Sequence, residues 1–207
     1  MALRIVGLGG SLRASSRSRA ALAVALDGAA AAGAAIELLD LRRLELPMFN
    51  PEHEAEAPAS VRTLIESSYA ADGMLWSSPM YNGSVSGSFK NAIDWLHLLG
   101  SREPSYLHDK VIGLISAAGG IQGLQVINTM EFSARSLRAW AVPYAVPISG
   151  ATVAFGASGA VEDERIKSQL HALGTEVVRV AGRFEHDPAL HRAAECERAA
   201  ERIVRAA

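Results

Sequence analysis

Hydrophobic residues along the chain follow two patterns, short continuous apolar runs and longer stretches with helical spacing. The continuous runs are rich in β-branched residues and end in glycine, serine or other polar residues, so they predict strands that are buried on both faces. These runs occupy residues 3–8, 35–41, 73–77, 110–116 and 141–148. In the last run, Pro143 and Pro147 predict a strand at the edge of a sheet, because proline cannot donate a ladder hydrogen bond.

Segments with helical spacing fill the intervals between the predicted strands. Alanine, the best helix former, dominates the first of them, and Gly33 is expected to end that helix. The predicted helices cover residues 20–32, 61–69, 86–96, 124–140, 162–184 and 186–207. Because strands alternate with helices, right-handed crossovers should build a parallel sheet that is covered on both faces. For five strands we therefore expect an α/β flavodoxin-like three-layer sandwich with the strand order 2-1-3-4-5.

The length and composition of the chain limit its domain organisation and its partners. With 207 residues, 49% of them hydrophobic, we expect one domain over residues 1–185 and a helical extension over residues 186–207. The formal net charge of -2 lacks the basic bias of nucleic-acid-binding proteins, so small molecules are the expected partners. No apolar run approaches the roughly 18 residues of a membrane-spanning helix, and the N-terminus lacks a signal-peptide pattern. We therefore expect a cytoplasmic protein that binds neither membranes nor nucleic acids.

Metal centres and nucleophilic catalysis are not indicated by the sequence. The single cysteine, Cys196, excludes an internal disulfide framework and multi-cysteine metal sites, and we interpret it as structural. The histidines lack the spacing of metal ligands, and His186 with His191 is interpreted as a solvated helix start. An interpretation of Ser84 and Ser86 as hydrolase residues also fails, because Val85 stands where a nucleophile elbow requires serine.

Three loops converge at one edge of the sheet in the expected strand order. The order reverses between the first and third strands, and open α/β sheets bind ligands beyond the carboxyl ends of the strands at such a switch point. The converging loops are residues 9–18, 79–87 and 116–123. A separate long connection after the second strand contains Pro47, Asn50, Pro51 and Pro58, and it is a candidate lid or interface.

The first loop combines hydroxyl groups and a guanidinium with the start of a helix. Exposed amides and the positive end of the helix dipole favour an anion there, and Arg13 offers a planar fork that matches a phosphate. Ser11, Ser16 and Ser18 add hydroxyl donors, so a phosphate monoester is the natural guest. Capping of the helix by these serines is an equally good interpretation. A dinucleotide fingerprint is excluded because its third glycine would fall on Leu12, and no P-loop ending is present.

The second loop has the composition of a segment that approaches a flat ligand. Pro79 stiffens the exit from the strand, and Gly83 and Gly87 allow the backbone to come close. Met80 or Tyr81 could then cover one face of a ring. The alternative is an ordinary turn followed by a helix whose core side chains are Ile93, Trp95 and Leu96.

These loops carry a resemblance to a known family. Two motifs are involved, Gly10-Ser11-x-Arg13-x-x-Ser16 and Ser78-Pro79-x-Tyr81-Asn82-Gly83-Ser84-x-x-Gly87-x-x-Lys90-Asn91-Ala92-x-Asp94-Trp95. Together they resemble the NADPH-dependent FMN reductase family, which has a flavodoxin-like fold. Residues 44–50 and 116–120 are similar to further segments of the family, and the resemblance covers about residues 4–180. Ser86 departs from it, because many relatives have proline there, and Ser18 replaces a common asparagine.

The resemblance implies that residues 1–185 bind FMN and that NADPH or NADH is the co-substrate. Electrons would pass to a small-molecule acceptor such as free flavin, a quinone or an azo compound. No catalytic side chain is expected, because the N5 atom of the flavin carries the hydride. The family pattern assigns the phosphate to Ser11, Arg13, Ser16 and Ser18. It assigns the ribityl chain and isoalloxazine to Pro79, Met80, Tyr81, Asn82 and Gly83, with Ser116, Gly119 and Gly120 on the other side.

The resemblance also implies a homodimer or homotetramer, since such reductases commonly pair through helices beside the flavin loops. An alternative function is that of a flavodoxin-type electron carrier, which binds FMN without turnover of NAD(P)H. Such carriers usually have acidic surfaces for docking to their partners. The near-neutral charge of this chain argues against that alternative.

Overall fold

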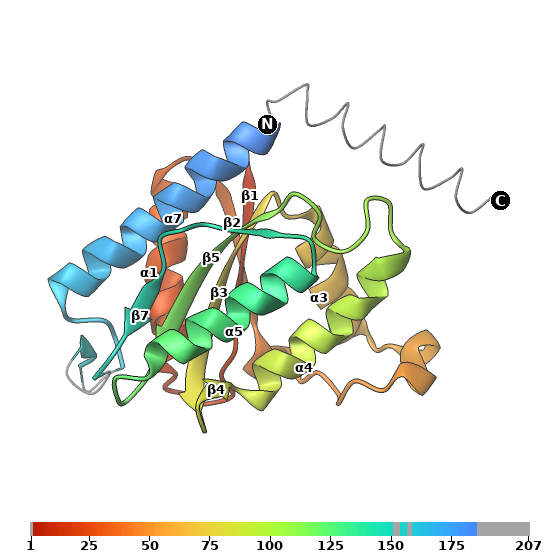
Figure 1. Cartoon of the computed structure of the whole chain (residues 1–207), viewed down its shortest axis with the longest axis horizontal. Helices are drawn as coiled ribbons and strands as arrows, with labels where there is room; N and C mark the ends of the chain where they lie inside the picture. The colour runs from red at the N-terminus through yellow and green to blue at the C-terminus, as the bar shows by residue number, and fades with distance from the viewer. Residues whose placement is uncertain (1, 151–153, 157–158, 186–207) are drawn as a thin grey trace.

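A computed structural model describes residues 2–150, 154–156 and 159–185 of the chain (Figure 1). The predicted extension 186–207, and Cys196 with it, lies outside the described residues. Every helix of the described part is too short or too polar to cross a lipid bilayer.

The centre of the molecule is a largely parallel sheet in the order β2-β1-β3-β5-β6, which confirms the flavodoxin-like topology. β7 pairs with β5 further along the same edge, and β4 pairs antiparallel with β3. The strands are β1 (Arg4–Gly9), β2 (Ala35–Asp40), β3 (Gly73–Tyr81), β4 (Ser84–Val85), β5 (Val111–Ala117), β6 (Trp140–Ala141) and β7 (Val146–Ile148).

Within the described residues the sheet has seven strands, where five were expected. The predicted edge strand 141–148 divides into β6 and β7, and Pro143 lies in the unpaired stretch between them. Because proline lacks an amide hydrogen, it cannot continue the ladder there. The edge position itself, inferred from the two prolines, is confirmed by the strand order.

The second extra strand arises because β3 runs past its expected end at residue 77. It continues to Tyr81 and then turns back through Asn82 and Gly83 into β4, where Tyr81 pairs with Ser84. Asn82 has φ 49° and Gly83 has φ 80°, the positive values that a two-residue type I′ hairpin turn needs at both central positions. For these two residues the interpretation as a turn is confirmed.

The helices cover both faces of the sheet, as Figure 1 shows. α1 and α7 pack on one face, and α3, α4 and α5 pack on the other, each with its own hydrophobic core cluster. The helices are α1 (Arg17–Ala31), α2 (Leu41–Leu44), α3 (Ala59–Ala70), α4 (Gly87–Trp95), α5 (Gly123–Ser136) and α7 (Glu164–Glu185), with short 3-10 helices at Pro51–Glu56 and Leu96–Ser101. α1 ends at Ala31, and Gly33, with φ 90°, follows its C-cap Ala32, in agreement with the predicted end of this helix.

The close contact between α1 and α7 depends on two glycines. A Cβ at Gly174 would lie 2.0 Å from the carbonyl oxygen of Ala25, and one at Gly28 would lie 2.5 Å from that of His171. Glycine is a poor helix former, so its presence in both helices reflects backbone packed directly on backbone. This contact holds α1 against the sheet and thereby positions the loop that precedes it.

The long connection after β2 is fixed against α4. The carbonyl oxygen of Pro47 accepts hydrogen bonds from Asn91 Nδ2 at 2.9 Å and Trp95 Nε1 at 2.8 Å, and Phe49 N donates to Asn91 Oδ1 at 2.8 Å. The Phe49 ring also meets the Trp95 ring edge to face at 5.1 Å. Asn91 therefore links the connection to the helix, and Trp95, predicted to be a core residue, is buried.

Candidate functional site

The loop between β1 and α1 is organised by hydroxyl groups. Ser16 is the N-cap of α1, and its Oγ accepts a hydrogen bond from Arg19 N at 3.1 Å. The hydroxyls of Ser16 and Ser18 are 3.1 Å apart, and Ser11 Oγ accepts from Arg13 N at 3.3 Å. All three serines are buried. The predicted capping function is thus confirmed for Ser16, while the loop as a whole still turns polar groups inward.

Gly10 fastens this first loop to the start of α4. Its carbonyl oxygen accepts hydrogen bonds from Ser86 Oγ and from Ser88 Oγ, the latter at 3.0 Å. A Cβ at Gly10 would lie 2.9 Å from Cβ of Phe89, so only glycine allows the loop and helix to approach this closely. Ser86, the departure from the family pattern, also caps α4 by accepting from Phe89 N at 3.2 Å. One hydroxyl therefore connects two of the three converging loops.

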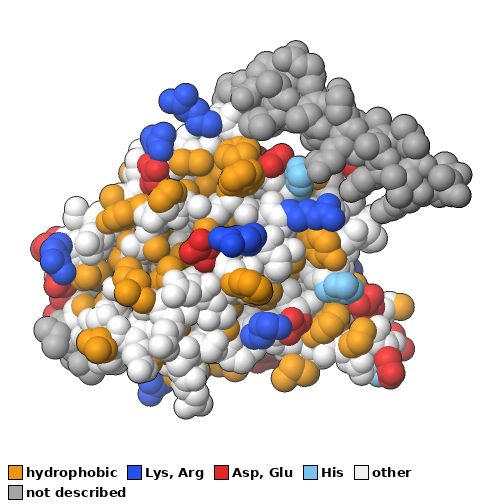
Figure 2. Space-filling view, in the orientation of Figure 1, with side chains coloured by type: hydrophobic (Ala, Val, Ile, Leu, Met, Phe, Trp, Pro, Cys, Tyr) orange, Lys and Arg blue, Asp and Glu red, His pale blue; other side chains and the backbone are white. Residues whose placement is uncertain are grey.

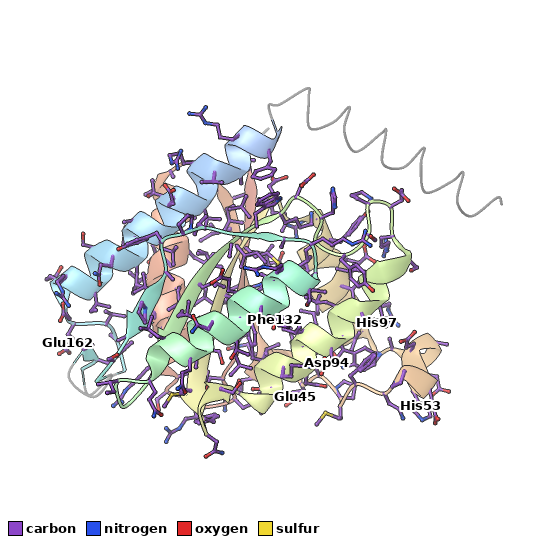
Figure 3. The ribbon with its side chains drawn as sticks, viewed as in Figure 1. Glu45, His53, Asp94, His97, Phe132 and Glu162 are labelled. Carbon is purple, nitrogen blue, oxygen red and sulfur yellow. The ribbon has the colours of Figure 1, made fainter. Side chains whose placement is uncertain are left out.

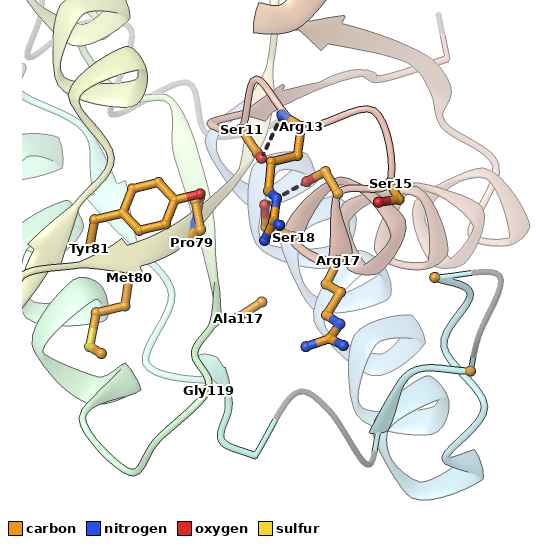
Figure 4. Close-up of a pocket in the computed structure, with 13 residues that line it drawn as sticks. Ser11, Arg13, Ser15, Arg17, Ser18, Pro79, Met80, Tyr81, Ala117 and Gly119 are labelled. Atoms are coloured by element: carbon orange, nitrogen blue, oxygen red, sulfur yellow. Dashed lines mark hydrogen bonds between the residues drawn. The ribbon is translucent and has the colours of Figure 1, made fainter.

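A cleft of about 360 Å³ opens where β1, β3 and β5 end (Figure 4). This volume lies at the lower end of the range for small-molecule pockets. The predicted residues that line it are Ser11, Arg13, Ser16, Ser18, Pro79, Met80, Tyr81 and Gly119. The strand order thus brings together residues that are far apart in the sequence.

Four predicted residues do not line this cleft. Asn82 and Gly83 form the hairpin turn beyond it, since their positive φ values serve the reversal of the chain. Ser116 is fully buried, and its Oγ donates to the carbonyl oxygen of Gly123 at 2.9 Å, which holds the third loop against α5. Gly120 is exposed one residue past the lining position of Gly119.

The cleft also has lining residues that the sequence interpretation missed, namely Ser15, Arg17, Ala117, Gly156 and Gly159. Ser15 and Arg17 lie inside the first loop, and the spacing of its polar residues could have indicated them. The two glycines lie between β7 and α7 and reach the cleft only through the tertiary fold. Neither hydrophobic periodicity nor a local motif marks them.

The charges around the cleft favour an anion. Within the described part of the chain, the guanidinium groups of Arg13 and Arg17 form no ion pair or hydrogen bond, and no acidic residue lines the cleft. Arg19, by contrast, donates to the carbonyl oxygen of Ala14 at 2.9 Å and lies 3.6 Å from Asp40. The first intrahelical hydrogen bond of α1 is made by Ala20 N, and Arg19 N already donates to Ser16 Oγ, so the amides of Arg17 and Ser18 are the ones at the helix start that a ligand can bind.

The opposite end of the cleft has a different chemistry. Figure 4 shows Met80 and Tyr81 on the end of β3, across the cleft from Ser11 and Arg13. Met80 is partly buried against the core, and the Tyr81 side chain is 48% exposed, so a thioether and an aromatic ring border this end. A ligand with a flat ring at one end and an anionic group at the other matches both ends.

The most perturbed lysine lies away from the cleft. Lys110 precedes β5 at its amino end, and its Nζ donates to the carbonyl oxygen of Ala71 at 2.6 Å. Burial lowers the pKa of Lys110 below its ordinary value of 10.5, and the nearby carboxylate of Asp72 offsets part of this effect. Lys110 therefore bears on stability and is remote from the converging loops. No group of three or more potential metal ligands occurs among the residues with described positions.

Comparisons with known proteins identify relatives of this chain. The sequence profile of NADPH-dependent FMN reductases matches residues 3–156. An NADPH azoreductase of Bacillus sp. (strain OY1-2) is 34% identical over 126 residues, which are 59% of this chain and 66%, just under two thirds, of the azoreductase. An NADPH:quinone oxidoreductase of Arabidopsis thaliana is 32% identical over 200 residues, which cover 87% of this chain and 95% of the relative.

Solved structures support the fold independently. The NAD(P)H:(acceptor) oxidoreductase FerB of Paracoccus denitrificans superimposes with a TM-score of 0.72 at 24% identity. The match covers 87% of this chain and 98% of that protein. At this level of identity the likeness concerns the arrangement of sheet and helices.

Proposed function

Since the chain belongs to the NADPH-dependent FMN reductase family, we propose that it binds FMN in the cleft and oxidises NADPH or NADH to reduce a small acceptor. The single observation that supports this most strongly is the two-ended cleft. Free cationic and amide donors gather at the start of α1, while Met80 and Tyr81 border the other end. FMN is a ligand with both halves, a phosphate monoester and a flat aromatic ring.

The residues of the phosphate end fit the cofactor in number and in kind. In this proposal the Ser11, Ser16 and Ser18 hydroxyls and the Arg13 guanidinium bind the phosphate, together with the first amides of α1. The buried serines hold the loop in one shape before the ligand arrives, so little entropy is lost on binding. The positive charges of Arg13 and Arg17 suit a dianion, because no acidic residue among the described lining residues opposes them.

The residues of the ring end orient the isoalloxazine and limit its exposure to water. Pro79 belongs to β3 and is paired in register with Ala117 of β5, so it presents a rigid floor. Met80 and Tyr81 follow it, while Gly119 closes the opposite side. The chemistry supplied by bound FMN is two-electron transfer from the nicotinamide to the acceptor, which leaves the protein with binding, orientation and exclusion of water.

For the acceptor we propose a quinone or an azo compound, the substrates that the names of two relatives carry.

We also propose that the protein acts in the cytoplasm as a homodimer or homotetramer. In support of an oligomer, Ile93, Asp94, His97 and Phe132 line a groove between α4 and α5, and the Phe132 side chain is 74% exposed (Figure 3). On the face shown in Figure 2, hydrophobic side chains lie exposed among charged ones. Gel filtration with light scattering tests the proposed oligomer, and a monomer at all concentrations would refute it.

The proposed activity is tested by a steady-state assay of the FMN-loaded protein. Oxidation of NADPH and of NADH is followed with a benzoquinone, an azo dye and free FMN as acceptors. We expect turnover with at least one of them and no turnover without protein. A protein that binds no flavin, or that binds FMN but turns over neither nicotinamide, would overturn the proposal. The second of these results would favour the alternative function of a flavodoxin-type electron carrier.

A further inference from the structure

We propose that the phosphate end of the cleft is closed by an end wall, formed by Ser15, Arg17, Gly156 and Gly159, which selects flavins that end in a phosphate monoester. The proposal rests on the proposed binding of FMN and adds the residues that discriminate FMN from riboflavin and from FAD. None of these residues belongs to the motifs that indicated the family. All of them line the cleft.

Arg17 supplies the charge of the end wall. It is the first residue of α1 and half-buried, whereas Arg13 is exposed. Figure 4 shows its side chain extending from the start of the helix into the cleft beside Ala117. Among the residues that the structure describes, it has no partner for its five donors, although Arg19 on the same helical turn is held by Ala14 and Asp40. A half-buried guanidinium without a partner favours binding of an anion.

The turn that carries the two glycines is anchored at its base. Phe155 and Val161 form an antiparallel bridge, and both side chains are buried in the core cluster beneath α1 and α7. Gly156 N donates to the carbonyl oxygen of Ala160 at 3.0 Å, and Gly159 N donates to that of Gly156 at 2.9 Å. The core contacts of the bridge therefore hold both glycines at the end of the cleft.

Gly159 also lies close to Ser15 of the first loop, which leaves no room for a ligand atom between these two residues. A Cβ added at Gly159 would lie 3.9 Å from Cβ of Ser15. The Gly159 Cα therefore lies within about 5.5 Å of that carbon, since one bond adds about 1.5 Å. Each carbon contact takes about 3.5–4.0 Å, so a ligand atom between them would need about 7 Å. Any ligand group that extends past the phosphate must leave across the open side of the cleft.

Among the four residues of the end wall, Arg17 is the charged one that lines the cleft. An acidic group, Glu162, lies against Gly156, where its Oε1 would be 1.7 Å from an added Cβ. This carboxylate stands against Gly156 but does not line the cleft. FMN ends in a dianionic monoester, whereas riboflavin lacks phosphate altogether. FAD carries a diphosphate diester with one charge on each phosphate and a nucleoside beyond it, which the close approach of Ser15 and Gly159 keeps from extending straight past the phosphate.

The experiment measures equilibrium binding of FMN, riboflavin and FAD to the apoprotein by quenching of flavin fluorescence. The variants are Arg17→Gln and Arg17→Lys, with Arg19→Gln as the matched control on the same helical turn. For the wild-type protein we expect FMN to bind at least about tenfold more tightly than riboflavin or FAD. Loss of a charge-assisted hydrogen bond should weaken FMN binding about 10- to 100-fold in Arg17→Gln.

The pattern across ligands separates charge recognition from a structural effect. In Arg17→Gln the riboflavin Kd should stay within about twofold, and the FMN Kd should depend less on salt. Arg17→Lys should recover part of the FMN affinity, and Arg19→Gln should leave it unchanged. Equal weakening of FMN and riboflavin, an unchanged FMN Kd in Arg17→Gln, or equal wild-type affinity for FAD and FMN would overturn the end-wall proposal alone. A wild-type protein that binds none of the three flavins would overturn the proposed function as well.

Discussion

Replacement of Gly174 by alanine tests how the packing of α7 positions the helix that starts at the cleft. The new Cβ would lie 2.0 Å from the carbonyl oxygen of Ala25 and 2.7 Å from the amide nitrogen of Ala29, so both obstacles are backbone atoms that cannot rotate away. Overpacking of this kind costs about 3 kcal/mol, and the better helix propensity of alanine returns about 1 kcal/mol. We therefore expect Gly174→Ala to lower the free energy of unfolding by about 2 kcal/mol.

The assay is equilibrium unfolding in urea, with Gly182→Ala as the matched control in the same helix. Among the described residues, a Cβ at Gly182 would meet Leu3 Cδ1 at 3.6 Å, an ordinary van der Waals contact. That substitution should therefore leave stability unchanged or raise it by about 0.5–1 kcal/mol. If Gly174→Ala were as stable as Gly182→Ala, direct backbone contact between α1 and α7 would not be what requires glycine.

Three further predictions concern the links between elements and one buried charge. Ser86→Ala removes the α4 cap and one hydrogen bond to Gly10. We expect the free energy of unfolding in urea to fall by about 1–2 kcal/mol and FMN to bind more weakly, and unchanged values for both would refute the link. Asn91→Ala breaks the hydrogen bonds to Pro47 and Phe49 and should lower the free energy of unfolding by about 2–3 kcal/mol. Full stability would show that the connection after β2 does not depend on these bonds. Burial lowers the pKa of Lys110, so the unfolded chain binds more protons between that pKa and 10.5, and stability should rise with pH through this window. The rise should be smaller in Lys110→Met, and identical pH profiles of unfolding free energy for this variant and the wild-type protein would contradict the prediction.

The strand order could be predicted because alternation of strands and helices leaves few topologies open. The end of β3 could not, because Pro79 looked like a terminator although its partner β5 supports it in register. The Asn82-Gly83 pair is a strong hairpin signal, yet the family motif around it favoured an interpretation as ligand contact. Its positive φ values show what the pair does in the fold.

The site divides in the same way between local and tertiary information. Ser11, Arg13, Ser16 and Ser18 lie in one loop at a helix start, where the physical reason for an anion can be read from the sequence. Gly156 and Gly159 reach the cleft only because Phe155 and Val161 are buried in the core. Contacts of that kind depend on the whole fold, so no local pattern predicts them.

The central claim is that this chain binds FMN and reduces it with NAD(P)H without the help of another protein. The most direct test is anaerobic rapid mixing of the FMN-loaded protein with NADPH and with NADH, followed by flavin absorbance. We predict that the oxidised flavin band is lost within a single turnover, at a rate that saturates with nicotinamide concentration. A flavin that binds but stays oxidised with both nicotinamides would contradict the claim.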